Sequence, residues 1–200
     1  MSQQIFRESN LQFQFNANWT VRKYDEHPFY QAMSGAGMSA VDFVGVHPLG
    51  QLLLMEVKNF NNRSERENLR TLEKLEGESP LLLEILEEKI EETQKGIRAI
   101  SQYLHRKWWY RTRFQLLDRP IFQKRLLQID RLFWMKASQI LQNFPNQVQI
   151  VLWLELPDEM EHKRAILQTH LSKYYVGTLP NAEIWSIEKH GTFVEVSTRT

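Results

Sequence analysis

Residues 40–60 read AVDFVGVHPLGQLLLMEVKNF, and this stretch predicts the centre of the fold. Two apolar runs flank a short turn, and only three charged side chains interrupt them: Asp42 in the first run, and Glu56 and Lys58 in the second. A charge inside an apolar strand is costly unless it is paired or binds a ligand. These three residues at related positions therefore predict a functional site.

The turn between the two runs predicts a β-hairpin. Residues 41–46 and 51–58 are rich in Val, Leu and Phe, which favours strands. Pro48 presets the backbone for the first central position of a type I turn, and Gly50 suits the left-handed position that follows. A three-residue loop of this kind is a common hairpin connection.

The loop length predicts which residues face each other. It pairs His47 with Gln51 and, counting back, Asp42 with Glu56. Directly opposed residues have Cβ atoms about 4.5–5.5 Å apart and point to the same face. Lys58 follows two residues after Glu56 and shares that face. The other face is expected to carry the apolar residues Val41, Phe43, Met55 and Val57. A loop one residue longer or shorter would reverse this parity.

Two carboxylates at this separation repel each other unless a cation lies between them. Oxygen ligands suit Mg²⁺ or Mn²⁺, so Asp42 and Glu56 are candidate metal ligands. Lys58 could orient or help to deprotonate a water, or stabilise charge that develops on a phosphate. The alternative is an ordinary salt bridge of Lys58 with Asp42 or Glu56 on a half-exposed hairpin.

The pattern of Asp42 on one strand and Glu56-Val57-Lys58 on the next resembles the PD-(D/E)XK nuclease superfamily, which has the restriction-endonuclease-like fold. The resemblance implies a metal-dependent nuclease in which Asp42 and Glu56 hold Mg²⁺ or Mn²⁺ and the Val57 carbonyl adds a ligand. It also implies that Lys58 serves the attacking water. Val41 stands where the family motif has proline, a residue without a chemical role.

The same resemblance implies supporting residues outside the hairpin. Many members place an acidic residue on a first helix. Residues 2–13 are expected to form a short helix that carries Glu8, and Glu26 is a competing candidate. Members often have a Gln or Lys on the helix after the second strand, and Gln94 is the candidate there. For Glu8 and Glu26 the alternative is a surface carboxylate without a ligand.

Charge is distributed unevenly along a chain whose formal net charge is +1. Residues 65–92 hold ten acidic and four basic residues, whereas residues 95–136 hold eleven basic and two acidic residues. Basic residues interleaved with aromatic ones can follow a phosphate backbone and stack on bases. The candidate nucleic-acid contacts are Arg98, Arg106, Lys107, Arg111 and Arg113. The alternative is a pair of amphipathic helices with solvated charges and aromatic side chains in the core, which we favour for the aromatic residues.

The rest of the chain alternates between helix and strand signals. Strands are expected over residues 18–25 and 148–156, and a closing hairpin over 184–189 and 192–197 with a turn at His190-Gly191. Helices are expected over residues 65–76, 80–109, 121–143 and 158–174. Residues 29–33 fit either a strand or a helical turn.

This order predicts an α/β fold with a mixed central β-sheet flanked by helices, in the αβββαβ order that the resemblance implies. Residues 1–200 suit a single domain, with a helical insertion over about 111–145. The chain has no cysteine, and its first residues lack the apolar core of a secretory signal. It also lacks the ~20 apolar residues of a membrane span. We therefore expect a cytoplasmic protein without a membrane partner.

The sequence predicts a divalent-metal-dependent nuclease, a hydrolase that cleaves phosphodiester bonds in nucleic acid. DNA is the favoured partner, and a homodimer is left open. The alternative is a non-catalytic nucleic-acid- or protein-binding module on the same fold. A scaffold that uses the acidic helix and the aromatic residues as an interface is a third interpretation. No HExxH or GxSxG motif supports a different chemistry.

Overall fold

A computed structural model of the protein describes residues 4–35, 37–61, 81–105, 125–175, 177–179 and 181–198. The helix expected over 65–76 and parts of those expected over 80–109 and 121–143 lie outside the described residues. In chain order the elements are β1 (Gln4–Glu8), β2 (Leu11–Phe15), β3 (Thr20–Lys23), α1 (Pro28–Ser34), β4 (Phe43–His47), β5 (Gln51–Asn59), α3 (Leu81–His105), α6 (Asp130–Asn143), η2 (Pro145–Gln147), β6 (Val148–Glu155), η3 (Asp158–Met160), α7 (Glu161–Tyr174), β7 (Ala182–Trp185) and β8 (Val194–Thr198).

A five-stranded sheet forms the centre of the molecule, in the order β3-β4-β5-β6-β7. The strands β3, β4 and β5 pair antiparallel, whereas β5, β6 and β7 pair parallel. A parallel pair needs a long crossover connection, and the one from β5 to β6 contains α3 and α6. The mixed α/β fold that the sequence predicts is confirmed.

The hairpin of β4 and β5 has the expected register. His47 pairs with Gln51, as the three-residue loop predicts. The Gly50 N–H donates a hydrogen bond of 2.9 Å to the His47 carbonyl. Gly50 has a φ of +86°, a left-handed conformation that glycine adopts without strain. The turn chemistry therefore sets the strand pairing.

The ladder of this hairpin ends before Asp42. Its last pair on β4 is Phe43, so Asp42 lies opposite Glu56 just beyond the ladder. The sequence predicts Val41 on the same face as Phe43, and this prediction is wrong because Val41 packs in the core under the helices. The chain bends at Asp42, and the Val41 N–H donates a hydrogen bond of 3.0 Å to Thr93 Oγ1 on α3.

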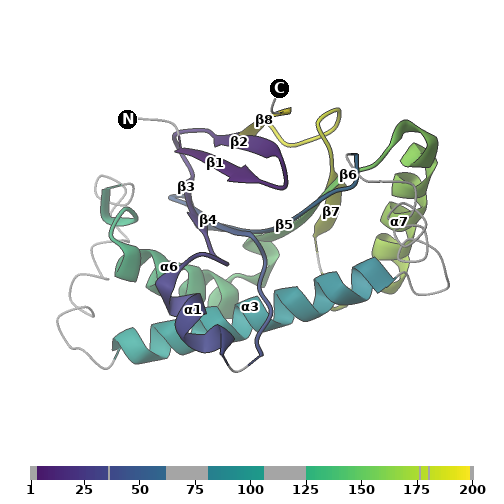
Figure 1. Ribbon diagram of the computed structural model, residues 1–200. Coiled ribbons are helices and arrows are strands. Elements are labelled where there is room, and N and C mark those ends of the chain that lie inside the picture. The colour runs from purple at the N-terminus through teal and green to yellow at the C-terminus, as the bar shows by residue number, and fades with distance from the viewer. Residues whose placement is uncertain are drawn as a thin grey trace.

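The molecule has three layers: a small sheet of β1, β2 and β8, the central sheet, and a layer of helices (Figure 1). The strand β5 contributes to both cores between these layers. Leu53, Met55 and Val57 pack toward the small sheet, whereas Leu52 and Leu54 pack toward α3 and α6. Because both faces of β5 are covered, its residues 52–55 form an unbroken apolar run.

The first residues form a β-hairpin, so the helix predicted over residues 2–13 is wrong. The strands β1 and β2 pair antiparallel across a turn in which Ser9 and Asn10 have φ values of 50° and 64°. Two consecutive positive φ values are typical of a type I′ hairpin turn. Apolar and polar residues alternate in β2, and Phe13 and Phe15 are fully buried against the central sheet. This period of two fits a strand and not a helix.

The closing hairpin predicted at His190-Gly191 is also wrong. The strand β7 extends the central sheet parallel to β6, and β8 pairs with β2 in the small sheet. Between them, the Ile187 N–H donates a hydrogen bond of 2.8 Å to Glu155 Oε1 at the end of β6. Pairing with distant strands therefore separates two segments that are locally compatible with a hairpin.

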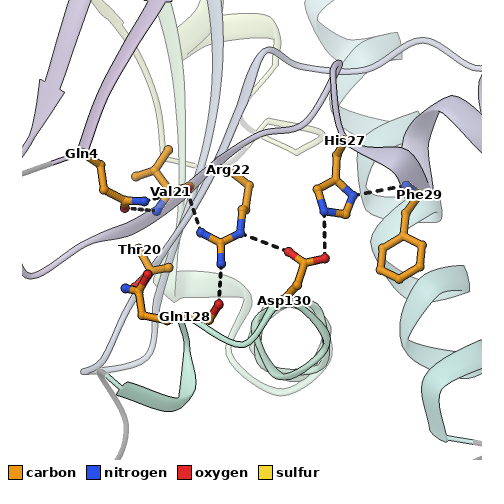
Figure 2. Close-up of polar contacts among 8 residues, drawn as sticks. All are labelled: Gln4, Thr20, Val21, Arg22, His27, Phe29, Gln128 and Asp130. Carbon is orange, nitrogen blue, oxygen red and sulfur yellow. Dashed lines mark hydrogen bonds and ion pairs between the residues drawn. The ribbon is translucent and has the colours of Figure 1, made fainter.

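The helix α6 begins at a polar junction with β3 and α1 (Figure 2). Arg22 Nε donates to Asp130 Oδ1 over 3.1 Å, and His27 Nε2 lies 2.9 Å from Asp130 Oδ2. Arg22 also donates to the Gln128 carbonyl over 3.0 Å. The Gln4 side chain forms two hydrogen bonds with the backbone of β3. These side-chain hydrogen bonds join β1 to β3, and they join β3 and α1 to the start of α6.

The helices cover the lower face of the central sheet (Figure 1). Phe133 and Trp134 on α6 are fully buried in the core that α6 shares with α3 and the sheet. These aromatic residues of the basic segment are therefore core residues, as the favoured alternative predicts. Among the described residues, no helix combines the length and the apolar character that crossing a membrane requires.

Candidate active site

Asp42, Glu56 and Lys58 lie together at the end of the β4–β5 hairpin, where Lys89 of α3 contacts Glu56. Asp42 comes just before β4, and Glu56 and Lys58 belong to the last part of β5. Asp42 is 9% exposed and Glu56 is 1% exposed. The two carboxylates are therefore adjacent in surroundings where an unpaired charge is costly.

Asp42 is held against the backbone of β5. Its Oδ2 accepts a hydrogen bond of 2.6 Å from the Val57 N–H. The pKa of Asp42 is raised from 3.8 to about 7, mainly because burial disfavours the charged form and also because Glu56 is negatively charged. The Val57 N–H and Lys89 oppose this rise. A cation at Asp42 would therefore compete with a proton near neutral pH.

Glu56 is contacted by two lysines on the same oxygen. Lys58 and Lys89 both donate to Oε1, and the Lys89 contact measures 2.7 Å. The other oxygen, Oε2, is buried and has no hydrogen-bond partner among the described residues. Burial of an oxygen without a hydrogen-bond partner costs free energy, so a ligand bound to Oε2 would stabilise the protein.

Lys89 is a site residue that the sequence interpretation missed. It lies on α3, three residues after the buried Leu86 and four before the buried Thr93. A lysine within the buried stripe of an amphipathic helix is the signal that identifies it. Gln94, the candidate predicted on this helix, instead accepts a hydrogen bond of 3.3 Å from the exposed Arg98.

Two more carboxylates lie beside Asp42. One ligand oxygen each of Glu8, Asp25 and Asp42 lies within 4.8 Å of the others. Glu8 comes from β1 and forms a salt bridge of 2.9 Å with Lys23. The competing candidate Glu26 also binds Lys23, but its side chain is 66% exposed. Glu8 therefore reaches the site from a strand, and Asp25 is a neighbour that the sequence did not indicate.

The pKa values of Glu8 and Asp25 are shifted in opposite directions. Burial alone would raise the pKa of Glu8, but hydrogen bonds from Lys23 and Ser9 lower it below its usual value. Burial raises the pKa of Asp25, and the charge of Lys23 opposes this rise. Glu8 is thus kept ionised at neutral pH, and it adds a lasting negative charge next to Asp42.

The oxygen atoms of this cluster fit a divalent cation. Mg²⁺ and Mn²⁺ prefer carboxylate and carbonyl oxygens. Glu56 Oε2 lacks a partner, and Asp42 is surrounded by further carboxylates. The Val57 N–H points at Asp42, and both backbone polar groups of a strand residue point to the same edge, so the Val57 carbonyl lies on that edge too. Asp42, Glu56 and Val57 could therefore hold a cation, with Glu8 and Asp25 beside it.

A surface hollow of about 270 Å³ has Glu8, one of these carboxylates, in its wall. The β1–β2 turn and the end of β8 form its walls, and Arg7, Glu8 and Lys23 contribute charged groups. Asn59 Nδ2 donates a hydrogen bond of 2.9 Å to the Ser9 carbonyl, which fixes the turn to the end of β5. A ligand in the hollow would therefore lie close to the acidic cluster.

The predicted nucleic-acid contacts are not part of this cluster. Arg98 lies nine residues after Lys89 on α3, about two and a half turns further, so it points to the opposite side of the helix. The remaining candidates lie outside the described residues: Arg106, Lys107, Arg111 and Arg113.

A second polar cluster, around His27 and Asp130, does not offer comparable chemistry (Figure 2). His27 Nδ1 accepts a hydrogen bond of 3.2 Å from the Phe29 N–H, so His27 Nε2 carries the proton that is shared with Asp130. Both imidazole nitrogens are occupied, and neither can accept a proton from a substrate. The cluster joins three elements and is structural.

Comparison of the chain with models of protein families, with curated proteins and with solved structures found no match. The functional assignment therefore depends on the geometry of the site.

Proposed function

We propose that this protein is a divalent-metal-dependent nuclease that hydrolyses phosphodiester bonds in nucleic acid, with DNA as the favoured substrate. The observation that carries the proposal is the pair of buried carboxylates, Asp42 and Glu56, adjacent across the hairpin with Lys58 bound to Glu56. The unpartnered Oε2 of Glu56 supports it, because a cation would satisfy that atom.

Each residue would have a distinct role. Asp42, Glu56 and the Val57 carbonyl would hold Mg²⁺ or Mn²⁺, which supplies a water of lowered pKa and neutralises charge on the phosphate. The Lys58 side chain is 28% exposed, so its ammonium would orient the attacking water or stabilise charge that develops on the phosphate. Burial of the two carboxylates would strengthen these interactions, because the local dielectric is low.

The substrate backbone would approach from the side where the hollow opens. Arg7 and Lys23 line the hollow, and cationic side chains bind phosphates in both DNA and RNA. Arg7 is exposed, and within the described part of the chain it has no ion-pair partner. These residues would hold a phosphate next to the acidic cluster.

A cleavage assay tests the proposal with single-stranded, duplex and branched DNA and with single-stranded RNA, in Mg²⁺ or Mn²⁺. Asp42→Asn, Glu56→Gln and Lys58→Ala are each expected to lower the rate at least about 100-fold. Glu91→Gln is the matched control, because the Glu91 side chain lies on the surface of α3 and is 59% exposed.

Calorimetric titration with Mn²⁺ provides a readout that does not need the right substrate. The wild-type protein is expected to bind Mn²⁺, and Asp42→Asn is expected to abolish this binding. The proposal fails if the wild-type protein cleaves no substrate and binds no Mn²⁺. It also fails if cleavage persists at the wild-type rate in Asp42→Asn.

The two lysines on Glu56 favour a second candidate, a non-catalytic nucleic-acid-binding module. Lys58 and Lys89 both bind Oε1 of Glu56, so the buried charge of Glu56 is paired without a metal. This candidate predicts nucleic-acid binding that survives Asp42→Ala and Lys58→Ala and needs no divalent cation. An affinity that falls with rising salt would indicate phosphate contacts.

A further inference from the structure

The partners of Glu56 are distributed unevenly over its two oxygens. Lys58 and Lys89 both donate to Oε1, whereas Oε2 has no hydrogen-bond partner among the described residues. Glu56 is 1% exposed, so these two ammonium groups are the main partners of its negative charge. The adjacent carboxylate of Asp42 supplies the second negative charge when it is ionised.

A divalent cation between Asp42 and Glu56 changes this balance. The dication and the two ammonium groups would then lie around the same carboxylate, and like charges this close repel each other. A buried excess of positive charge is unfavourable. The departure of one lysine from Glu56 relieves this repulsion when the cation binds.

Lys89 is the lysine that is free to leave. Lys58 follows Glu56 by two residues on the same strand face, so the backbone of β5 keeps its ammonium nearby. Lys89 instead reaches Glu56 from α3, and its side chain is 22% exposed. A lysine has a flexible four-carbon stem, so a change of rotamer takes its ammonium to solvent without moving either backbone.

We infer that the Lys89 ammonium pairs with the Glu56 carboxylate in the metal-free protein and that Mg²⁺ or Mn²⁺ displaces it when the metal binds. Lys89 is then a positioning residue, which keeps the buried charge of Glu56 paired and its carboxylate oriented until the metal arrives. After displacement its ammonium can face the phosphate of the substrate. This inference rests on the proposed function, because it takes Asp42 and Glu56 as the metal ligands.

Calorimetric titration with Mn²⁺ tests the displacement in wild type, Lys89→Met and Lys95→Met. Removal of Lys89 removes the competitor, so the Mn²⁺ affinity is expected to rise about 10-fold or more, the equivalent of one charge-assisted hydrogen bond. Lys95 lies on the same helix with a side chain 58% exposed, and its substitution should leave the affinity unchanged. An affinity of Lys89→Met that equals or falls below that of wild type would overturn the inference.

Thermal unfolding gives a second readout that a merely structural lysine would not produce. In EDTA, Lys89→Met is expected to unfold at a lower temperature than wild type, because Glu56 loses a charged partner. In saturating Mn²⁺ this difference should disappear. Lys89→Gln keeps a hydrogen-bond donor and replaces Lys89→Met if the latter does not fold. An equal loss of stability with and without Mn²⁺ would make Lys89 structural and overturn the inference.

The outcomes separate this inference from the proposed function. If the wild-type protein binds no Mn²⁺ and cleaves no substrate, both are overturned. If Mn²⁺ binding is lost in Asp42→Asn but is no tighter in Lys89→Met, only the displacement of Lys89 is overturned.

Discussion

Asp42 is a residue whose ionisation opposes folding. It is buried beside Glu56, and its pKa is raised from 3.8 to about 7, mainly by burial. A raised pKa in the native state means that the folded protein binds a proton more tightly than the unfolded chain does. The contribution of Asp42 to stability is therefore fully present below pH 3.8 and is lost as the pH rises through about 7.

In metal-free buffer, the free energy of unfolding of wild type should fall relative to that of Asp42→Asn as the pH rises from about 4 to about 8. The upper limit is about 1.4 kcal/mol for each pH unit between the two pKa values. Asn stays neutral, and its side-chain oxygen can still accept the Val57 N–H. Urea unfolding over a pH series measures the difference, with the exposed Asp158→Asn as control. A difference that does not change with pH would contradict this prediction.

At the scale of elements, Asp130 fastens the start of α6 to β3 and α1 (Figure 2). Burial alone would raise the pKa of Asp130, but the hydrogen bonds from His27 and Arg22 and the charge of Arg22 lower it below its usual value. Asp130 also lies in the first turn of α6, where the helix dipole favours a negative charge. The ionised carboxylate therefore stabilises this junction.

Asp130→Asn is expected to lower the free energy of unfolding by about 1 kcal/mol at pH 7. Because the native pKa is lowered, the stabilisation is present above the unfolded pKa and is lost as the pH falls through the native value. The difference in free energy of unfolding between wild type and Asp130→Asn should therefore approach zero in acid. Urea unfolding at neutral and acid pH checks this, and a deficit that stays constant would show that charge is not its cause.

Gly191 allows the segment between β7 and β8 to close over Trp185. A Cβ at Gly191 would lie 2.6 Å from Trp185 Cη2, so Gly191→Ala must displace the ring or the segment. Such overpacking is expected to cost about 1–3 kcal/mol of stability. Gly177→Ala is the control, because a Cβ there meets no atom within 4 Å. Equal unfolding temperatures of the two variants would contradict the prediction.

At the scale of the whole molecule, the candidate site lies where the three layers meet. The central strand β5 supplies Glu56 and Lys58, α3 supplies Lys89, and β1 from the small sheet supplies Glu8. A ligand of this cluster would therefore bind the folded protein and not the unfolded chain, in which these residues are far apart.

Mn²⁺ should therefore raise the unfolding temperature of the wild-type protein. At a free Mn²⁺ concentration about 100-fold above its Kd, the gain in stability is expected to be about 2.7 kcal/mol. Asp42→Asn and Glu56→Gln should remove this gain, and Glu91→Gln should keep it. Differential scanning calorimetry with and without Mn²⁺ measures the effect. An unfolding temperature that is independent of Mn²⁺ would contradict the prediction.

The structural features that depend on residues close together in the chain could be predicted from the sequence. The loop from Pro48 to Gly50 sets the hairpin register, because turn geometry depends on a few neighbouring residues. The register then places Asp42 and Glu56 opposite each other. The apolar run over residues 148–156 predicts a strand, and β6 occupies Val148–Glu155. These features account for the β4–β5 hairpin and for the centre of the candidate site.

Which distant strands pair with each other, and which distant residues join the candidate site, became apparent only in the folded structure. It pairs β8 with β2 and β7 with β6, because strand pairing depends on the edges available in the folded sheets and not on the turn at Gly191. It brings Glu8 and Asp25 to Asp42, and Lys89 to Glu56, across separate elements. Hydrophobic periodicity shows which face of an element is buried, but only packing determines the partner that this face meets.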